Sequence, residues 1–339
     1  ASWGEEMGLS QEDADVGKIV TALKMMGVDY VFDTDFAADL TIMEEGYELL
    51  DRMKNGGTLP MITSCSPGWI NFVEKTYPDL LPHVSSCKSP QQMFGAIAKT
   101  YYADKMGIPR DKMFVVSIMP CIAKKYECQR PEMNSSGYQD VDVVLTTREL
   151  AQMIRMAGLD FNFLPEEEFD HPLGLGSGAG AIFGTSGGVM EAAIRTVYEV
   201  VTGKEPQSLD FTACRGHEGI KEATLDLDGT PVKVAITNGL KNARVLMDKI
   251  RAGEADYQFI EVMCCPGGCV GGGGQPFRTT AAIREHRMDG LYKVDKNMNL
   301  RQSHKNPDIQ TLYSEFLKEP NSHLAHELLH THYEDRSDK

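Results

Sequence analysis

Three loops rich in glycine and proline carry five of the eight cysteines, and each loop directly follows a short apolar run. The loops read Thr63-Ser64-Cys65-Ser66-Pro67-Gly68, Met119-Pro120-Cys121 and Cys264-Cys265-Pro266-Gly267-Gly268-Cys269. Turns of this kind leave backbone N–H groups free to point at sulfur, which favours an iron–sulfur cluster over a disulfide. Disulfide frameworks are typical of short secreted domains, whereas these cysteines are sparse over 339 residues. A structural zinc is the alternative, for which only Cys265 and Cys269 have suitable spacing.

Short β-branched runs alternate along the chain with segments of helical spacing, which predicts an α/β protein with mostly parallel sheets flanked by helices. The expected strands are 59–63, 113–119, 141–146, 232–237 and 258–263, and the expected helices are 39–54, 89–106, 147–156, 188–202 and 240–252. We expect a first lobe over 1–165, a second over 166–300 and a helical extension over 301–339. Because the cysteine loops follow predicted strands, they should converge on a crevice between the lobes.

Charge and hydropathy exclude several classes of function. The chain has 34 Lys and Arg against 49 Asp and Glu, a net charge of −15, which argues against binding nucleic acid. No apolar run approaches the ~18 residues of a membrane span, and residues 1–15 lack the apolar core of a signal peptide. We therefore expect a cytoplasmic protein, with export through the signal of a partner subunit, and hence a periplasmic location, as the alternative. The glycine cluster at 176–180 lacks the lysine of a nucleotide-binding loop.

Three segments taken in order resemble the catalytic domain of the iron-only, or FeFe-type, hydrogenases. They are residues 63–69, 119–127 and 261–276, and the likeness extends from about residue 4 to the C-terminal segment. The resemblance implies an H-cluster, in which a 4Fe–4S cubane is bridged by one cysteine to a two-iron unit. That unit would carry carbon monoxide, cyanide and a bridging azadithiolate. The implied reaction is the reversible reduction of protons to dihydrogen.

The resemblance also implies which side chains hold the cubane. Cys121 and Cys265 match cubane ligands, and Cys269 matches the ligand that bridges to the two-iron unit. Ser66 stands where the family has its fourth ligand. Three alternatives are open: Ser66 binds iron through its oxygen, Cys65 shifts to become the ligand, or this corner of the cubane has no protein ligand. We favour Ser66, because moving Cys65 requires a register shift just before the stiff Pro67. The remaining cysteines match no ligand role and are expected to be buried thiols: Cys87, Cys128, Cys214 and Cys264.

Further residues match the pocket of the two-iron unit. Lys124 matches a lysine that holds a cyanide, a suitable partner for a buried ammonium group, although a surface lysine is the plainer interpretation. Met119, Pro120 and Met263 match the walls of the pocket, and Gln91, Phe183 and Gly184 match its further neighbours. For the methionines and Phe183, ordinary core packing is the alternative.

One face of the predicted helix 39–54 carries Glu45, Glu48 and Arg52, spaced at i, i+3 and i+7. A solvated, salt-bridged face is the plain interpretation of this pattern. The resemblance instead implies a proton route in which Ser85 stands between the two glutamates and Cys65 is the last donor. Carboxyl and hydroxyl groups both donate and accept protons, which such a route requires.

These features favour a hydrogenase that takes electrons from a low-potential carrier such as ferredoxin. A slow hydrogen sensor is one rival, against which Glu45, Glu48, Ser85 and Lys124 count. A non-catalytic iron–sulfur assembly factor of the same fold is another, and it should need neither Lys124 nor Met263. The chain lacks the upstream Ala-Pro strand of the family and any C-x₂-C-x₂-C run. We expect it to be part of a longer protein or to work with a subunit or further iron–sulfur domains, and to depend on maturation proteins.

Overall fold

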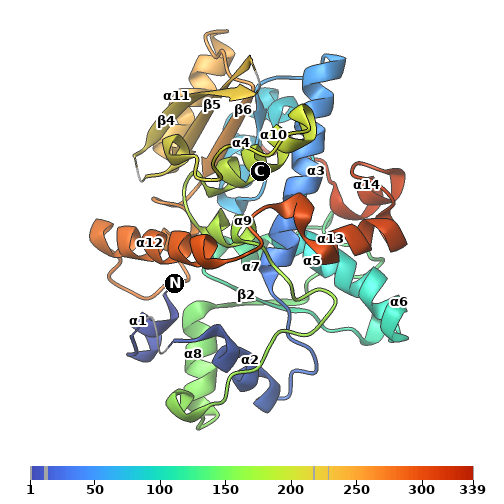
Figure 1. The fold of residues 1–339 in the computed structure, drawn as a ribbon, viewed down its shortest axis with the longest axis vertical. Helices are drawn as coiled ribbons and strands as arrows, with labels where there is room; N and C mark the ends of the chain where they lie inside the picture. The colour runs from blue at the N-terminus through green and yellow to red at the C-terminus, as the bar shows by residue number, and fades with distance from the viewer. Residues whose placement is uncertain (1, 11–13, 217, 228, 339) are drawn as a thin grey trace.

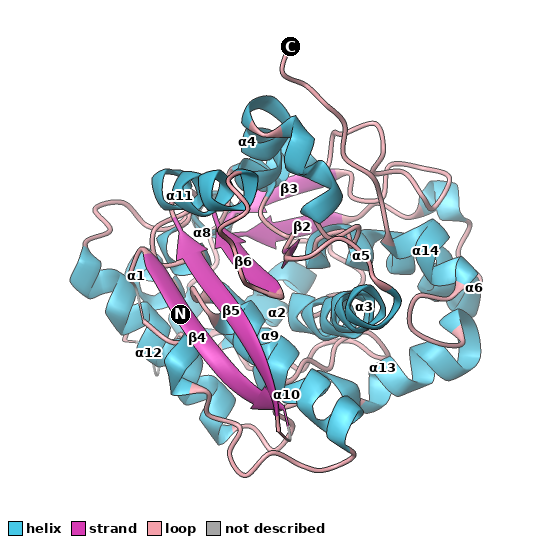
Figure 2. Ribbon diagram, turned by 90° about the horizontal axis from the view of Figure 1, so that it is seen from above, coloured by secondary structure: helices cyan, strands magenta, loops and turns pink. Residues whose placement is uncertain are grey.

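A computed structural model describes residues 2–10, 14–216, 218–227 and 229–338. Two sheets form in these residues (Figures 1 and 2). The larger has the strand order β1-β6-β5-β4, with β1 at Met61–Ile62, β6 at Phe259–Met263, β5 at Thr230–Asn238 and β4 at Ile220–Leu227. Its first three strands are parallel, and β4 is antiparallel to β5. The smaller sheet pairs β2 (Val116–Met119) in parallel with β3 (Val143–Thr146), Val116 facing Val143.

The helices account for most of the remaining regular structure. Their bounds are α1 Trp3–Met7, α2 Val16–Met25, α3 Thr34–Asn55, α4 Pro67–Thr76, α5 Pro90–Ile97, α6 Ala103–Met106, α7 Ala123–Glu127, α8 Thr147–Met156, α9 Gly178–Ala181, α10 Gly188–Thr202, α11 Leu240–Arg251, α12 Ala281–Asn297, α13 Pro307–Leu312 and α14 His323–Leu329. A π-helical turn at Ala98–Tyr102 joins α5 to α6. The α/β class with mostly parallel strands is thus confirmed, while β4, α4 and α12 were not predicted.

The larger sheet lies between two layers of helices, because its strands alternate their side chains between two faces. Phe259 and Met263 of β6 join a core with side chains of α3 and α10, whereas Ile260 and Val262 join a core with α4 and α11. Figure 2 shows α4 and α11 on one side of this sheet and α10 on the other. The fully buried Trp69 of α4 donates its indole N–H to the carbonyl of Thr63 at 3.0 Å. This bond fixes α4 against the loop that follows β1.

The two sheets draw on distant parts of the sequence. β1 lies within the first predicted lobe, yet it pairs with β6 of the second. Figure 1 shows β4, β5 and β6 above and β2 with α8 and α2 below, while α3 runs alongside both parts. The division at 165 and 300 stays a prediction. Among the described residues, no helix combines the length and the apolar character needed to cross a membrane.

A buried carboxylate ties α3 to the C-terminal segment. Asp39 has no exposed surface and accepts hydrogen bonds from Ser177 (2.5 Å from Oγ, 2.9 Å from the backbone N), Ser303 Oγ at 2.7 Å and Asn306 Nδ2 at 2.8 Å. Burial raises the pKa of Asp39 to about 6, against the effect of these four bonds. A single side chain therefore joins α3, the N-terminus of α9 and the turn before α13.

We expect Asp39→Ala to lower the free energy of unfolding by about 3 kcal/mol or more, because it leaves several buried donors without an acceptor. The matched control is Asp51→Ala on the exposed part of the same helix, where Asp51 accepts only from Asn55 among the described residues. That change should stay within about 0.5 kcal/mol of the parent. Denaturant titrations measure both. Equal losses in the two variants would show that the Asp39 cluster is not a structural anchor.

Candidate functional site

The three cysteine loops converge on one cavity of about 1030 Å³, which we call the cluster cavity. Cys65 lies just beyond β1, Cys121 just beyond β2 and Cys265 just beyond β6, so the carboxyl ends of strands from both sheets face the same space. Every residue predicted to face the cluster lines this cavity: Cys65, Ser66, Gln91, Met119, Pro120, Cys121, Lys124, Phe183, Gly184, Met263, Cys265 and Cys269. Their roles toward a cluster stay predictions, but the structure brings them together.

Glycines shape the loop between Cys265 and Cys269. Gly267 and Gly268 have φ of 78° and 92°, in the left-handed region that glycine enters without strain. A Cβ at Gly268 would lie 2.8 Å from the backbone N of Ser186, so the loop packs directly on the segment before α10. The Gly268 N–H donates to the carbonyl of Cys265 at 3.0 Å, which closes the turn and brings both cysteines to the cavity.

The sulfurs in the cavity influence one another electrostatically. Burial and the neighbouring Cys121 and Cys265 raise the pKa of Cys269 to about 12. Burial and the Glu45 carboxylate likewise raise the pKa of Cys65 well above its usual value. Several thiolates in one buried cavity are therefore unfavourable unless cations accompany them. Soft thiolates are the usual ligands of iron–sulfur clusters, so this donor set fits the implied cubane.

Cys264 was expected to be a buried thiol, but it is only partly buried and lines the cavity. Its backbone N–H donates to Ser66 Oγ at 3.2 Å. Its sulfur lies against α4, 2.6 Å from where a Cβ on Gly68 would stand. A hydrogen bond from Cys265 lowers the pKa of Cys264. The adjacent pair Cys264-Cys265, in a chain that has Ser66 at the usual ligand position, was the available signal.

Lys124 is buried in the wall of the cavity, not on the surface. Its ammonium group donates to the carbonyl of Cys65 at 3.0 Å and pairs with Glu127 at 2.9 Å. Burial alone would lower the pKa of Lys124, but the Glu127 carboxylate outweighs it and the pKa is raised. An ammonium group has three N–H donors, so these two bonds leave one.

Glu127 links Lys124 to the helix α5. The same Glu127 oxygen accepts from Ser89 Oγ at 2.9 Å and from Gln91 Nε2 at 3.3 Å. The Gln91 carbonyl oxygen in turn accepts from Ser117 Oγ at 2.9 Å. This network holds the lysine in one orientation, and neither Glu127 nor Ser89 was predicted from the sequence. The signal available was Glu127 at i+3 from Lys124 on a short helix.

The predicted proton route is partly connected in the structure. Arg52 donates to Glu48 at 2.7 Å, and Ser85 Oγ donates to the other oxygen of Glu48 at 2.7 Å. Burial works against ionisation of Glu48, but Arg52 and these hydrogen bonds outweigh it and its pKa is lowered. Glu48 is thus the anchored, ionised carboxylate at the outer end of the row.

Glu45 is the opposite kind of carboxyl group. It is buried, and neither of its oxygens has a hydrogen-bond partner in the described part of the chain. Burial, with the charge of Glu48, raises the pKa of Glu45 to about 8. At neutral pH the group is therefore protonated; once it ionises at higher pH, its charge raises the pKa of Cys65 at the cavity wall. The helix face is not a solvated one at this position.

Two family models match the chain. The model described as the C-terminal domain of the iron only hydrogenase large subunit matches residues 1–273. The model described as the iron hydrogenase small subunit matches residues 281–336, which contain α12, α13 and α14.

Curated relatives extend this picture. The NADP-reducing hydrogenase subunit HndD of Solidesulfovibrio fructosivorans is 52% identical over 98% of this chain and 58% of its own length. The periplasmic [Fe] hydrogenase large subunit of Nitratidesulfovibrio vulgaris is 52% identical over 80% of this chain and 65% of its own length. Protein NAR1 of Arabidopsis thaliana is 34% identical over 93% of this chain and 72% of its own length. The chain spans about three fifths of the two hydrogenase relatives.

A solved structure agrees with these sequence matches. The chain superposes on an [FeFe]-hydrogenase structure concerned with stepwise H-cluster assembly, with a TM-score of 0.87 and 46% identity. The match covers 98% of this chain and 91% of the other. The chain therefore belongs to the iron-only hydrogenase family, as its three cysteine-bearing segments predict.

Proposed function

We propose that this chain is the cluster-binding domain of an iron-only hydrogenase that reversibly reduces protons to dihydrogen. What supports this proposal is that one cavity collects the thiols. Arg52 and Ser85 both bond Glu48, and the buried Glu45 acts electrostatically on Cys65 at that cavity. A binding or assembly protein has use for the thiols alone. A protein that consumes or releases protons at the cavity also needs groups that carry them from the surface.

Cys121, Cys265 and Cys269 would hold the cubane, with Cys269 also reaching the two-iron unit. When bound, the H-cluster would pass electrons from the carrier to protons, and return them to the carrier when dihydrogen is oxidised. The third donor of Lys124 would hold a cyanide of the two-iron unit, as a charge-assisted hydrogen bond in a dry pocket. Met119, Pro120 and Met263 would exclude water, with Gln91, Phe183 and Gly184 beside them.

Two other functions compete with turnover. The NAR1-type relatives, several of which are named as iron–sulfur assembly factors, favour a non-catalytic role that keeps only the cubane-type cysteines. A hydrogen sensor would keep the H-cluster but turn over slowly. Infrared bands of carbonyl and cyanide after maturation would exclude the assembly factor, and the turnover rate would separate enzyme from sensor.

The electron partner and the compartment belong to the whole protein. A ferredoxin-like carrier suits a low-potential cluster, and the HndD relative is a subunit of an NADP-reducing hydrogenase. The cytoplasmic location predicted from the sequence stays a prediction, because one of the relatives is named periplasmic.

For the fourth corner of the cubane, we propose Cys264 in preference to Ser66 and Cys65. A thiolate is the softer ligand, and Cys264 lines the cavity next to Ser66, whose oxygen already accepts the Cys264 N–H. With Cys264 as the ligand, Cys65 stays next to Glu45 and can still transfer protons. A register shift that made Cys65 the ligand would take that role away. The family's thiol ligand is missing at position 66, and Cys264 on the facing loop would supply a thiol in its place.

Counting iron and recording the paramagnetic resonance of the reduced cubane test this assignment. We expect Cys264→Ala to lose iron from the cubane or change its signal, while Ser66→Ala and Cys65→Ala keep a normal cubane. The reverse pattern, with an altered cubane in Ser66→Ala alone, returns the role to Ser66. A metal-free protein in Cys65→Ala alone assigns it to Cys65.

Lys124→Ala should reduce retention of the two-iron unit at least tenfold, because a charge-assisted hydrogen bond contributes about 1.5–3 kcal/mol. Lys125→Ala is the matched control, since Lys125 is a partly exposed neighbour that pairs with Glu149. Infrared band intensity per chain measures retention. Unchanged di-iron content and turnover in Lys124→Ala would remove this role.

Replacing Glu45 or Glu48 with Gln should keep the iron content and lower both hydrogen evolution and uptake by orders of magnitude. The amide keeps the size of the carboxyl group but cannot relay a proton at ordinary pH. Asp51→Asn, on the exposed part of the same helix, is the control and should keep parent rates. Parent rates in both glutamine variants would mean that this helix face only supports the fold.

A further inference from the structure

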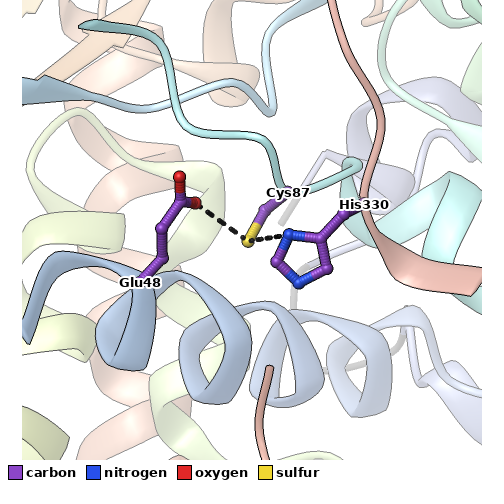
Figure 3. A group of neighbouring side chains, drawn as sticks. All are labelled: Glu48, Cys87 and His330. Atoms are coloured by element: carbon purple, nitrogen blue, oxygen red, sulfur yellow. Dashed lines mark hydrogen bonds between the residues drawn. The ribbon is translucent and has the colours of Figure 1, made fainter. Parts of the chain in front are cut away.

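Glu48, Cys87 and His330 gather at a second place, outside the cluster cavity (Figure 3). The Cys87 sulfur lies 3.6 Å from Glu48 Oε2 and 4.0 Å from His330 Nδ1. The three atoms all lie within 4.8 Å of one another. Glu48 comes from α3, Cys87 from the loop before α5 and His330 from the residue after α14. Neither Cys87 nor His330 has a part in the function proposed above.

We propose that Glu48, Cys87 and His330 form a binding site for one divalent cation of the zinc class. Thiolate sulfur, imidazole nitrogen and carboxylate oxygen are the donors that zinc takes in proteins, and three protein ligands with water in the fourth position are a common arrangement. Zinc bonds of about 2.0–2.3 Å in a tetrahedron place neighbouring donors about 3.5 Å apart. The sulfur's separations of 3.6 and 4.0 Å from its two neighbours are close to this value, and the third separation is within 4.8 Å, so binding draws the donors together by about 1 Å or less.

The backbone holds two of the three donors in register. Cys87 and His330 form an isolated antiparallel bridge. On either side of it, Lys88 N donates to the carbonyl of Leu329 and Thr331 N to the carbonyl of Ser86, both at 2.8 Å. Cys87 and His330 therefore face each other as a pair without hydrogen bonds between them, the arrangement in which opposite side chains come closest. The sulfur and the imidazole stay together whether or not an ion is bound.

A further carboxylate orients the imidazole. His330 Nε2 lies 3.0 Å from Glu44 Oε2, and Glu44 is fully buried. This partner assigns the ring proton to Nε2 and leaves Nδ1 as an acceptor, with the Cys87 sulfur 4.0 Å from it. A carboxylate on the far nitrogen is the usual companion of a metal-binding histidine. Ser86 Oγ, 2.8 Å from Nδ1, is the partner that an ion would replace.

The local charges suit a doubly charged ion. Arg52 occupies the other oxygen of Glu48 at 2.7 Å and carries one positive charge. Together with the ion, this makes three positive charges against three negative ones, on Glu44, Glu48 and the Cys87 thiolate. Buried charges are tolerated when they are paired in this way. Glu45, protonated at neutral pH, adds no charge to the count.

An ion here would join α3 to the segment matched by the small-subunit family model, which supplies His330. It would also bind the Glu48 oxygen that now accepts from Ser85. If Glu48 carries protons, the bound ion interrupts their passage. This consequence for turnover rests on the proposed function, whereas the site itself does not.

Zinc uptake by the cluster-loaded protein tests the site, because iron then occupies the cysteines of the cluster cavity. The protein is titrated with Zn²⁺, and bound zinc is counted by elemental analysis and examined by X-ray absorption at the zinc edge. We expect one zinc per chain with one sulfur neighbour and the rest nitrogen or oxygen. Cys87→Ala and His330→Ala should each weaken binding at least tenfold, and Glu44→Gln should weaken it 10- to 100-fold.

Two variants serve as matched controls. Cys214→Ala removes another buried thiol, and His326→Ala removes the exposed ring that stacks on His330 with centroids 4.1 Å apart. Both should keep full zinc binding. Cys87→Ser keeps the size of the side chain and should therefore fold like the parent. Loss of zinc in this variant would reflect the missing thiolate and not misfolding. Retention of zinc in both Cys87→Ala and His330→Ala, or no zinc uptake by the parent protein, overturns the proposal.

Hydrogen turnover measured with and without zinc separates the two proposals. Inhibition of the parent enzyme, relieved in Cys87→Ala, supports both the site and the role of Glu48. Stoichiometric zinc binding with unchanged turnover supports the site and counts against Glu48 as a proton carrier.

Discussion

The mutual repulsion of thiolates in one buried cavity is the constraint on which the rest of this structure depends. Cys121, Cys265 and Cys269 lie in loops that follow strands of two different sheets. Beyond the effect of burial, Cys265 raises the pKa of Cys121, and both of them raise the pKa of Cys269. Such a set gains stability only when cations bind it, so the loops must hold the sulfurs in place beforehand. Parallel strands place such loops together, because their carboxyl ends lie at one edge of the sheet. Glycines in the loops allow the tight turns that bring the sulfurs to the cavity.

The Cys264–Cys269 loop is held by a buried charge on the strand that precedes it. Glu261 of β6 is fully buried and accepts from the backbone N–H of Gly187 at 2.6 Å and of Met190 at 2.8 Å, at the start of α10. The positive end of the helix stabilises the carboxylate, and the carboxylate fixes the helix against the strand. Because Gly268 packs on Ser186 just before α10, this one interaction also positions the cysteine loop. A charge buried in the sheet thus serves the geometry of the cluster cavity.

Sequence periodicity predicted most of what lies in the two sheets and the long helices, because those elements bury one clear face. β4 was missed because a lysine, Lys221, takes a position on the buried face of this edge strand, which interrupts the apolar alternation. α12 was missed because its apolar and charged residues are mixed around the helix, with Arg287 and Asp295 buried in ion pairs. The cysteine loops were predictable as following strands, which is a local signal. The pairing of Cys87 with His330 was not, because 243 residues separate them and only the bridge reveals it.

The two glutamates of α3 show why similar residues one turn apart can have different tasks. Arg52 and Ser85 hold Glu48 ionised, whereas burial and the charge of Glu48 raise the pKa of Glu45 to about 8. A proton passing from Glu48 to Glu45 therefore moves toward the group that holds it more tightly, with each unit of pKa difference equal to about 1.4 kcal/mol. In the proposed route the proton would next pass from Glu45 to Cys65. Burial and Glu45 raise the pKa of that thiol, so Cys65 releases the proton only when negative charge builds up in the cavity. If the proposed route operates, a proton waits on Glu45 beside the cavity at neutral pH, and Glu48 stays ionised because Arg52 is bound to it.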